Sequence, residues 1–155
     1  MGRELIQNNM QARRSLALRL TLASVPFGLA YIWIGVQHFT NTAWFEPIVP
    51  AVLGDPSLWV LVTGVMEVLI GAGLLLPRTR AYAALTSVLF LVAVYWANLN
   101  MWVNDIPLDG TTFGNGWHVL RLLAQLGMIL LSVYIFRSSK RSTEPADELG
   151  FFLSS

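Results

Sequence analysis

Four long stretches that carry almost no charge set the strongest limit on how this chain of 155 residues can fold. A helix needs about 20 mostly apolar residues to cross a membrane. Stretches of this kind cover residues 16–37, 57–76, 81–103 and 117–136. We therefore expect an all-α membrane protein made of one domain with four transmembrane helices, followed by a polar tail over residues 137–155.

The overall composition excludes several other classes of protein. Only 12% of the residues are charged, whereas soluble domains usually carry about 25%. Cysteine is absent, which removes disulfides, thiolate metal sites, iron–sulfur clusters and thiol exchange by the chain itself. Basic residues do not gather beside aromatic ones, so we expect membrane lipid and no nucleic acid as a partner.

The first apolar stretch has two interpretations. Basic residues precede it, as they do in a signal peptide, but the run is long and no small-residue cleavage site follows it. We interpret it as a retained anchor. Pro26 within this stretch predicts a kink rather than a break, because neighbouring helices can satisfy the carbonyl group that proline frees.

The basic residues predict the orientation of the chain. The segments 39–57 and 103–116 contain no Lys or Arg, while nine basic residues lie at or beyond the other ends of the spans: Arg3, Arg13, Arg14, Arg19, Arg78, Arg80, Arg137, Lys140 and Arg141. By the positive-inside rule both termini are then cytoplasmic. Short connections favour antiparallel neighbours, so we expect an antiparallel up-down bundle. The proline-rich outer segment 40–59 is expected to cap it.

Two charges nevertheless fall inside the spans. From Leu122 to Phe136 there are only fifteen uncharged residues, so the fourth span must start near Trp117, which draws Arg121 into the membrane. Glu67 lies in the middle of the second span, with Gly64 and Gly71 on the same helix face, where small residues allow a neighbouring helix to approach closely.

Depth along the spans groups the polar residues in the outer half of the membrane. On the fourth span His118, Arg121 and Gln125 form one stripe; His38 and Asn98 lie near the outer ends of their spans, and Glu67 forms the floor of this group. All six tryptophans map to the same half, while the inner half is nearly pure Leu, Val, Ala and Ile. We predict that Glu67 and Arg121 interact, directly or through Gln125 or a water molecule, because unpaired charges are costly in lipid.

Two roles for this polar group remain open. It holds helices together, or it binds a ligand through His38, Glu67, Asn98, His118, Arg121 and Gln125. The chain contains no pattern of a hydrolase triad, so we assign no catalytic residue. We assign no metal ligand either, with the two histidines as metal or haem ligands the less favoured alternative. The tryptophans form either an interfacial belt or the walls of a pocket for a flat ligand.

Five short motifs, taken in order, resemble the DoxX-like family of small four-span bacterial membrane proteins. They are QHF (37–39), IVP (48–50), GVMEVLIGAGLLLPRTR (64–80), ANLNM (97–101) and RLLAQ (121–125). The long motif, with its GVxE…GLLLPRTR block, is the most specific of the five, and the others are short. Where relatives often have Pro-Ala-Asn-x-His, this chain has Trp96-Ala97-Asn98-Leu99-Asn100, so no ligand role is transferred to Asn100.

The resemblance implies a subunit of the bacterial cytoplasmic (inner) membrane that works near quinone or redox chemistry. On that basis the first hypothesis is an accessory or anchoring component of a membrane redox complex, non-catalytic itself, with a hetero-oligomeric membrane partner or as a homo-oligomer. The alternative is an oxidoreductase or binding protein that holds a quinone or another small ligand in the outer half of the bundle. A transporter ranks last, because no polar path crosses the inner half.

Overall fold

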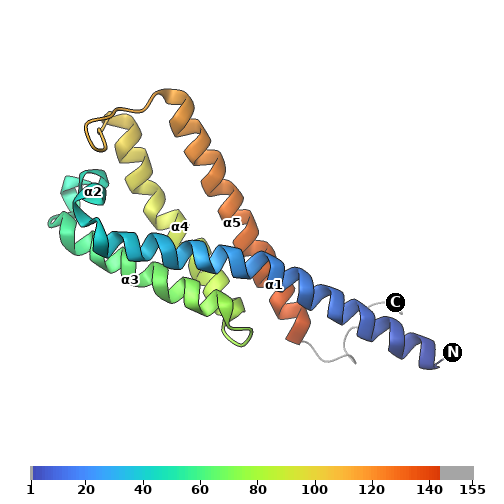
Figure 1. Ribbon diagram of the computed structural model, residues 1–155. Coiled ribbons are helices and arrows are strands. Elements are labelled where there is room, and N and C mark those ends of the chain that lie inside the picture. Colours follow the sequence, from blue (N-terminus) through green and yellow to red (C-terminus); the bar gives the residue numbers. More distant parts are fainter. Residues whose placement is uncertain (1, 144–155) are drawn as a thin grey trace.

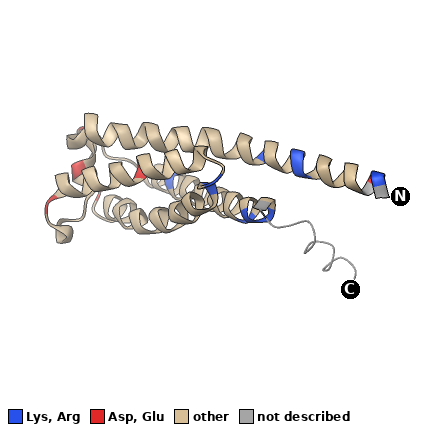
Figure 2. Ribbon diagram, turned by 90° about the horizontal axis from the view of Figure 1, so that it is seen from below, with Lys and Arg blue, Asp and Glu red and all other residues tan. Residues whose placement is uncertain are grey.

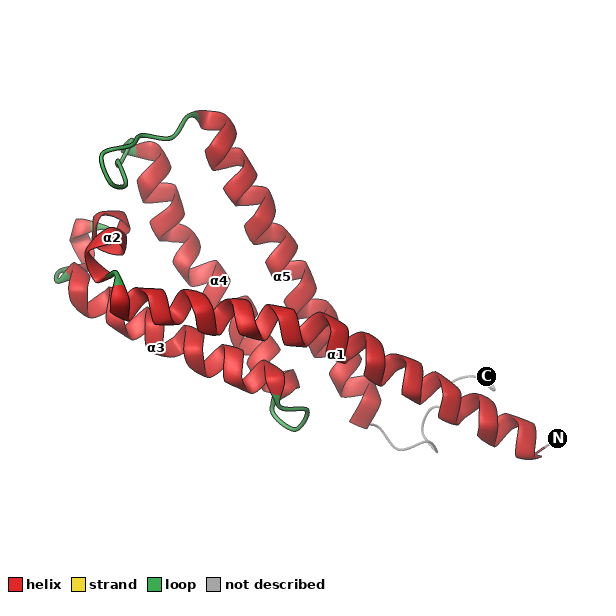
Figure 3. Ribbon diagram, in the orientation of Figure 1, coloured by secondary structure: helices red, strands yellow, loops and turns green. Residues whose placement is uncertain are grey.

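The computed structural model describes residues 2–143, and within that range the chain is all-helical, without a strand (Figures 1 and 3). The long helices are α1 (Gly2–Thr40), α3 (Pro56–Leu75), α4 (Arg80–Val103) and α5 (Asn115–Thr143). Between α1 and α3 lie the short helix α2 (Thr42–Phe45) and the 3₁₀ turns η1 (Glu46–Ile48) and η2 (Ala51–Leu53). All four long helices are long and apolar enough to span a membrane, which confirms the predicted all-α class and the four apolar helices of spanning length.

Two helices extend beyond the predicted spans. Helix α1 begins at Gly2 and runs through Pro26 without interruption, and its first part projects past the other helices (Figure 1). Helix α5 continues to Thr143, so residues 137–143 of the predicted tail are helical. The remainder of that tail lies outside the described residues.

Helices α1 and α3 meet at glycines. Gly28 lies opposite Gly71, and Gly35 lies opposite Gly64. Residue numbers rise along α1 as they fall along α3, so the two helices are antiparallel. A Cβ atom added to Gly71 would lie 2.6 Å from the carbonyl oxygen of Gly28. Such a close approach of two backbones is possible only because these positions carry no side chain. The expectation that small residues beside Glu67 let a neighbour approach is confirmed.

The connection between α3 and α4 satisfies the last carbonyl groups of α3. Thr79 Oγ1 donates to the carbonyl of Gly73 (2.9 Å), and Arg80 Nε donates to the carbonyl of Leu74 (3.1 Å). The last carbonyls of a helix have no partner within the helix, and a basic side chain at that end is also favoured by the helix dipole. Arg80 is consequently buried as the first residue of α4, although the charge pattern placed it in a loop.

Helices α4 and α5 form the second antiparallel pair (Figure 1). Halfway along the bundle the hydroxyl groups of Tyr31 and Ser87 lie 2.7 Å apart, and those of Ser87 and Ser132 lie 2.9 Å apart. All three side chains are buried. This chain of hydrogen bonds joins α1, α4 and α5 among the apolar side chains of the core.

The segment between α1 and α3 lies at the end of these two helices and also contacts α4 (Figure 1). Asn100 Nδ2 on α4 donates to the carbonyl of Ile48 (3.2 Å), and Trp59 Nε1 on α3 donates to the carbonyl of Leu53 (2.8 Å). Ser57 Oγ donates to a carboxylate oxygen of Glu46. The turns of this segment are thereby tied to two long helices.

Replacing Gly71 by valine should destabilise the protein by about 1–3 kcal/mol, because the new side chain has no space against the backbone of α1. Gly127→Val is the matched control: Gly127 is also helical, and a Cβ atom there meets nothing within 4 Å. Both variants carry the same β-branched residue in a helix, so their difference isolates the contact. Thermal unfolding in detergent, followed by circular dichroism, measures it; equal losses in both variants would contradict the packing described.

Candidate functional site

The structure divides the six predicted ligand residues between two places. His38 and Glu67 meet between α1 and α3. Asn98, His118, Arg121 and Gln125 lie between α4 and α5, where Asn98 bonds Gln125 and shares the lining of one cavity with His118 and Arg121. The sequence predicted a single outer-half group with Glu67 at its floor; the described residues instead form two clusters.

His38 and Glu67 form a buried pair. His38 Nδ1 lies 3.1 Å from Glu67 Oε2 and 2.9 Å from the carbonyl oxygen of Ile34, one helical turn earlier. The Nδ1–H group donates to the carbonyl of Ile34. Glu67 Oε2 is therefore close to the ring without a well-aligned hydrogen bond. The imidazole ring also stacks on Phe45 of α2, with 4.0 Å between ring centroids. A carboxylate beside an imidazole can hold one proton between them, which keeps the pair's net charge small in an apolar surrounding.

The predicted interaction between Glu67 and Arg121 is wrong in its direct form and in the form bridged by Gln125. Among residues 2–143 Glu67 lies against His38 and forms no ion pair with Arg121, and Gln125 bonds Asn98 and the carbonyl of Leu91 rather than either of these two residues. The reason is geometric. Side chains of a helix lean toward its N-terminus, so Glu67, held against α1 by Gly64 and Gly71, reaches outward to His38.

Gln125 ties α5 to α4. Its Oε1 accepts from Asn98 Nδ2 (2.8 Å), and its Nε2 donates to the backbone carbonyl of Leu91. Gln125 is only 3% exposed, so a side chain without these partners would be costly. The two amides therefore serve mainly to hold the helices together.

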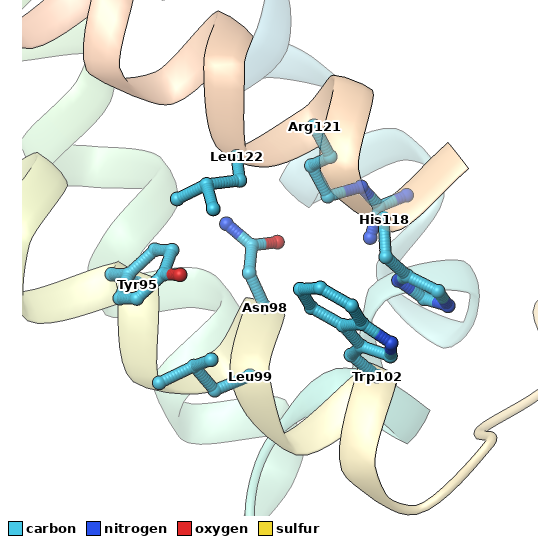
Figure 4. Close-up of a pocket in the computed structure, with 7 residues that line it drawn as sticks. All are labelled: Tyr95, Asn98, Leu99, Trp102, His118, Arg121 and Leu122. Atoms are coloured by element: carbon cyan, nitrogen blue, oxygen red, sulfur yellow. The ribbon is translucent and has the colours of Figure 1, made fainter. Parts of the chain in front are cut away.

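His118 and Arg121 line a small cavity beside Trp102, closed by Tyr95, Asn98, Leu99 and Leu122 (Figure 4). The rings of His118 and Trp102 are parallel within 6° and 5.5 Å apart. Arg121 Nη1 donates to Met101 Sδ (2.7 Å), and its guanidinium carbon lies 6.0 Å from the centre of the Phe113 ring. The cavity holds about 10 Å³, which is room for about one water molecule.

Sequence reasoning missed the buried hydroxyl groups. Ser24, Ser87, Ser132 and Ser139 are buried, so the inner half is not as purely apolar as predicted. A lone serine in an apolar helix gives no signal, because it can bond the carbonyl four residues earlier, as Ser132 does with Met128. One signal was present: Ser24, Tyr31 and His38 follow each other at intervals of seven residues and so share one face of α1.

Fold and site together define an all-helical protein with four helices of membrane-spanning length and buried polar clusters between them. A model of the family described as "Domain of unknown function (DUF8561)" matches residues 27–136, and the chain belongs to that family. The matched range contains all six residues of the two clusters. No curated protein and no solved structure matches the chain.

Double-mutant cycles distinguish the observed pairing from the one expected from the sequence. His38→Ala and Glu67→Ala should each destabilise the protein, and their coupling energy should exceed about 0.5 kcal/mol, because each change leaves the other polar group buried without its partner. The cycle of Glu67→Ala with Arg121→Ala is the control and should be additive within about 0.5 kcal/mol. Denaturation in detergent gives both values. Strong coupling in the second cycle and none in the first would restore the Glu67–Arg121 pair.

Proposed function

We propose that this chain is a DoxX-like integral membrane subunit that anchors or assembles a larger membrane redox complex without catalysing a reaction itself. The observation that carries the proposal is that the predicted ligand residues mostly serve contacts within the chain. His38 and Glu67 contact each other, Asn98 and Gln125 join α4 to α5, and the cavity between His118 and Arg121 has room for about one water molecule. Buried polar groups that are used in this way hold helices in place.

The surface supports a role in assembly. Large apolar side chains face outward along α4 and α5, among them Leu89, Trp96, Leu120, Leu123 and Leu130. Of the four long helices, α5 buries the smallest share of its most apolar stretch. Such a surface is in contact with lipid or with another membrane chain: a partner subunit or a second copy of this chain. Because the chain has no cysteine, redox chemistry through thiols would have to reside in the partner.

The proposal includes an antiparallel up-down arrangement in the bacterial inner membrane with both termini in the cytoplasm. Figure 2 shows Lys and Arg gathered toward the end where α1 begins and α5 ends, and most Asp and Glu toward the opposite end. Basic residues on one side of the membrane are what the positive-inside rule requires of a cytoplasmic face. The reversed direction from α1 to α3, seen in the glycine contacts, fits the same arrangement.

Single cysteines test this orientation directly, because the natural chain has none to remove. Thr112→Cys lies in the segment between α4 and α5, and Ser142→Cys lies near the end of α5; both positions are exposed. A membrane-impermeant maleimide added to intact cells should label the first variant and not the second, whereas both should react after lysis. Labelling of the second variant alone would reverse the orientation.

A second candidate is a pocket for a quinone or another small ligand in the outer half. It is favoured by His118, whose Nδ1 is buried without a partner beside Arg121 and the flat ring of Trp102 (Figure 4). The present cavity would have to widen, through movement of the rings or of α4 against α5, before an aromatic head group could enter.

Gentle purification with mass spectrometry of the intact assembly separates these two functions. The subunit proposal expects a partner chain in fixed stoichiometry, retained in Arg121→Ala, with no extractable quinone. The pocket expects bound quinone that is lost in Arg121→Ala and retained in Arg137→Ala, an exposed arginine near the other end of α5. A uniform monomer that carries neither would contradict both.

A further inference from the structure

Two adjoining hollows follow the seam between α4 and α5, and they share Tyr95 and Leu122. The first is the small cavity at Arg121 and His118, whose wall is mostly apolar apart from these side chains and Asn98. The second is an open groove of about 170 Å³ with nearly all of its wall apolar, formed by Val92, Leu126 and Ile129 with the shared residues and Gln125. The seam therefore has a cationic side chain at one end and an apolar groove along the rest.

The cation at this end of the seam has no counter-charge. Among residues 2–143, no carboxylate forms an ion pair with Arg121, and the acceptor of its one hydrogen bond is the thioether of Met101. A thioether is a weak acceptor, whereas a guanidinium carries five N–H donors suited to carboxylate or phosphate oxygens. A charge at this depth normally finds a partner. Arg121 therefore has donors to spare for an anion from outside the chain.

His118 provides the second, independent observation. The side chain is 96% buried, since only 4% of its surface is exposed, yet its Nδ1 has no hydrogen-bond partner. Stacking on Trp102 holds the ring at the wall of the same cavity as Arg121 (Figure 4). A buried polar atom without a partner is uncommon and calls for a ligand or a bound water.

The cationic end and the apolar groove lie at different depths along α5, as the head group and the acyl chain of a lipid do. Arg121 is six residues from the start of α5, or about 9 Å along the helix, and its side chain leans back toward that start. Ile129 lies eight residues further, about 12 Å deeper. The cationic end is thus near the membrane surface, and the apolar groove runs toward the membrane centre.

We propose that the α4–α5 seam binds one phospholipid, with a segment of one acyl chain in the groove at Val92, Leu126 and Ile129. Its phosphodiester lies on Arg121 and His118, where the side chains must move apart because the present cavity of about 10 Å³ has room for about one water molecule. Charge complementarity selects this occupant. A phosphodiester is negatively charged and can form an ion pair with Arg121. A quinone ring is neutral and would leave the guanidinium without a counter-charge. The lipid needs no redox partner, so this inference is independent of the function proposed above.

Binding of defined lipids to the full-length, delipidated protein, measured by native mass spectrometry, tests the site. The probes are phosphatidylglycerol, phosphatidylethanolamine and diacylglycerol with identical chains. Both phosphodiester lipids should bind one to one, and diacylglycerol about tenfold or more weakly, the cost of losing a charge-assisted hydrogen bond. Glycerol phosphate, which has no chain, should not compete. Equal binding of diacylglycerol, or competition by glycerol phosphate at equal affinity, would overturn the proposal.

Four variants locate the binding. Arg121→Gln removes the charge, and Leu126→Trp fills the groove with the charge left in place; each should weaken phosphatidylglycerol about tenfold or more. Arg137→Gln and Leu130→Trp are their controls on the same helix, at exposed positions outside both hollows, and should bind as the natural chain does. Leu126→Trp keeps the test valid if Arg121→Gln does not fold. Unchanged binding in both site variants, or displacement of the phospholipid by a quinone at lower concentration, rejects the phospholipid site.

Discussion

The close approach of α1 and α3 at four glycines is the contact on which the rest of this structure depends. Gly28, Gly35, Gly64 and Gly71 let two backbones touch, and Glu67 lies between the two contacts on α3. A carboxylate at that position cannot turn to lipid without breaking the packing, so it must find a partner near α1. His38 lies one turn outward and supplies it. The same small residues thus create the packing and confine the charge.

The two helix pairs solve the problem of buried polarity in different ways. Between α1 and α3 an acid lies against a base, and the cap segment closes over them through the ring of Phe45. Between α4 and α5 the amides of Asn98 and Gln125 satisfy each other and a backbone carbonyl. The hydroxyl groups of Tyr31, Ser87 and Ser132 then link the two pairs in the middle of the bundle. Each contact joins helices, so these polar residues hold the bundle together.

Much of this arrangement was predictable from the sequence, and the failures have a common cause. The lengths of the apolar runs revealed four helices and forced Arg121 into the membrane, and the spacing of Gly64 and Gly71 indicated a close contact. Depth along a helix follows from counting residues, but which helices are neighbours does not. Within the described residues α3 packs mainly on α1 and α4, and α5 on α4 and α1, so Glu67 and Arg121 share neither an interface nor a bond. The hydroxyl chain was missed for a related reason, because its three members come from three helices.

That separation has a chemical consequence. Had Glu67 neutralised Arg121, this part of the bundle would hold one closed charge pair and no cation in need of a partner. Instead the acid lies against an imidazole on α1, and the guanidinium on α5 is left with a sulfur atom and an aromatic ring as its neighbours. A buried cation with such weak partners is unfavourable in an apolar environment. Binding of an anion beside it would lower the free energy of the chain. The described bundle therefore leaves its unpaired guanidinium on the α4–α5 seam, where an anion from outside the chain would supply the missing partner.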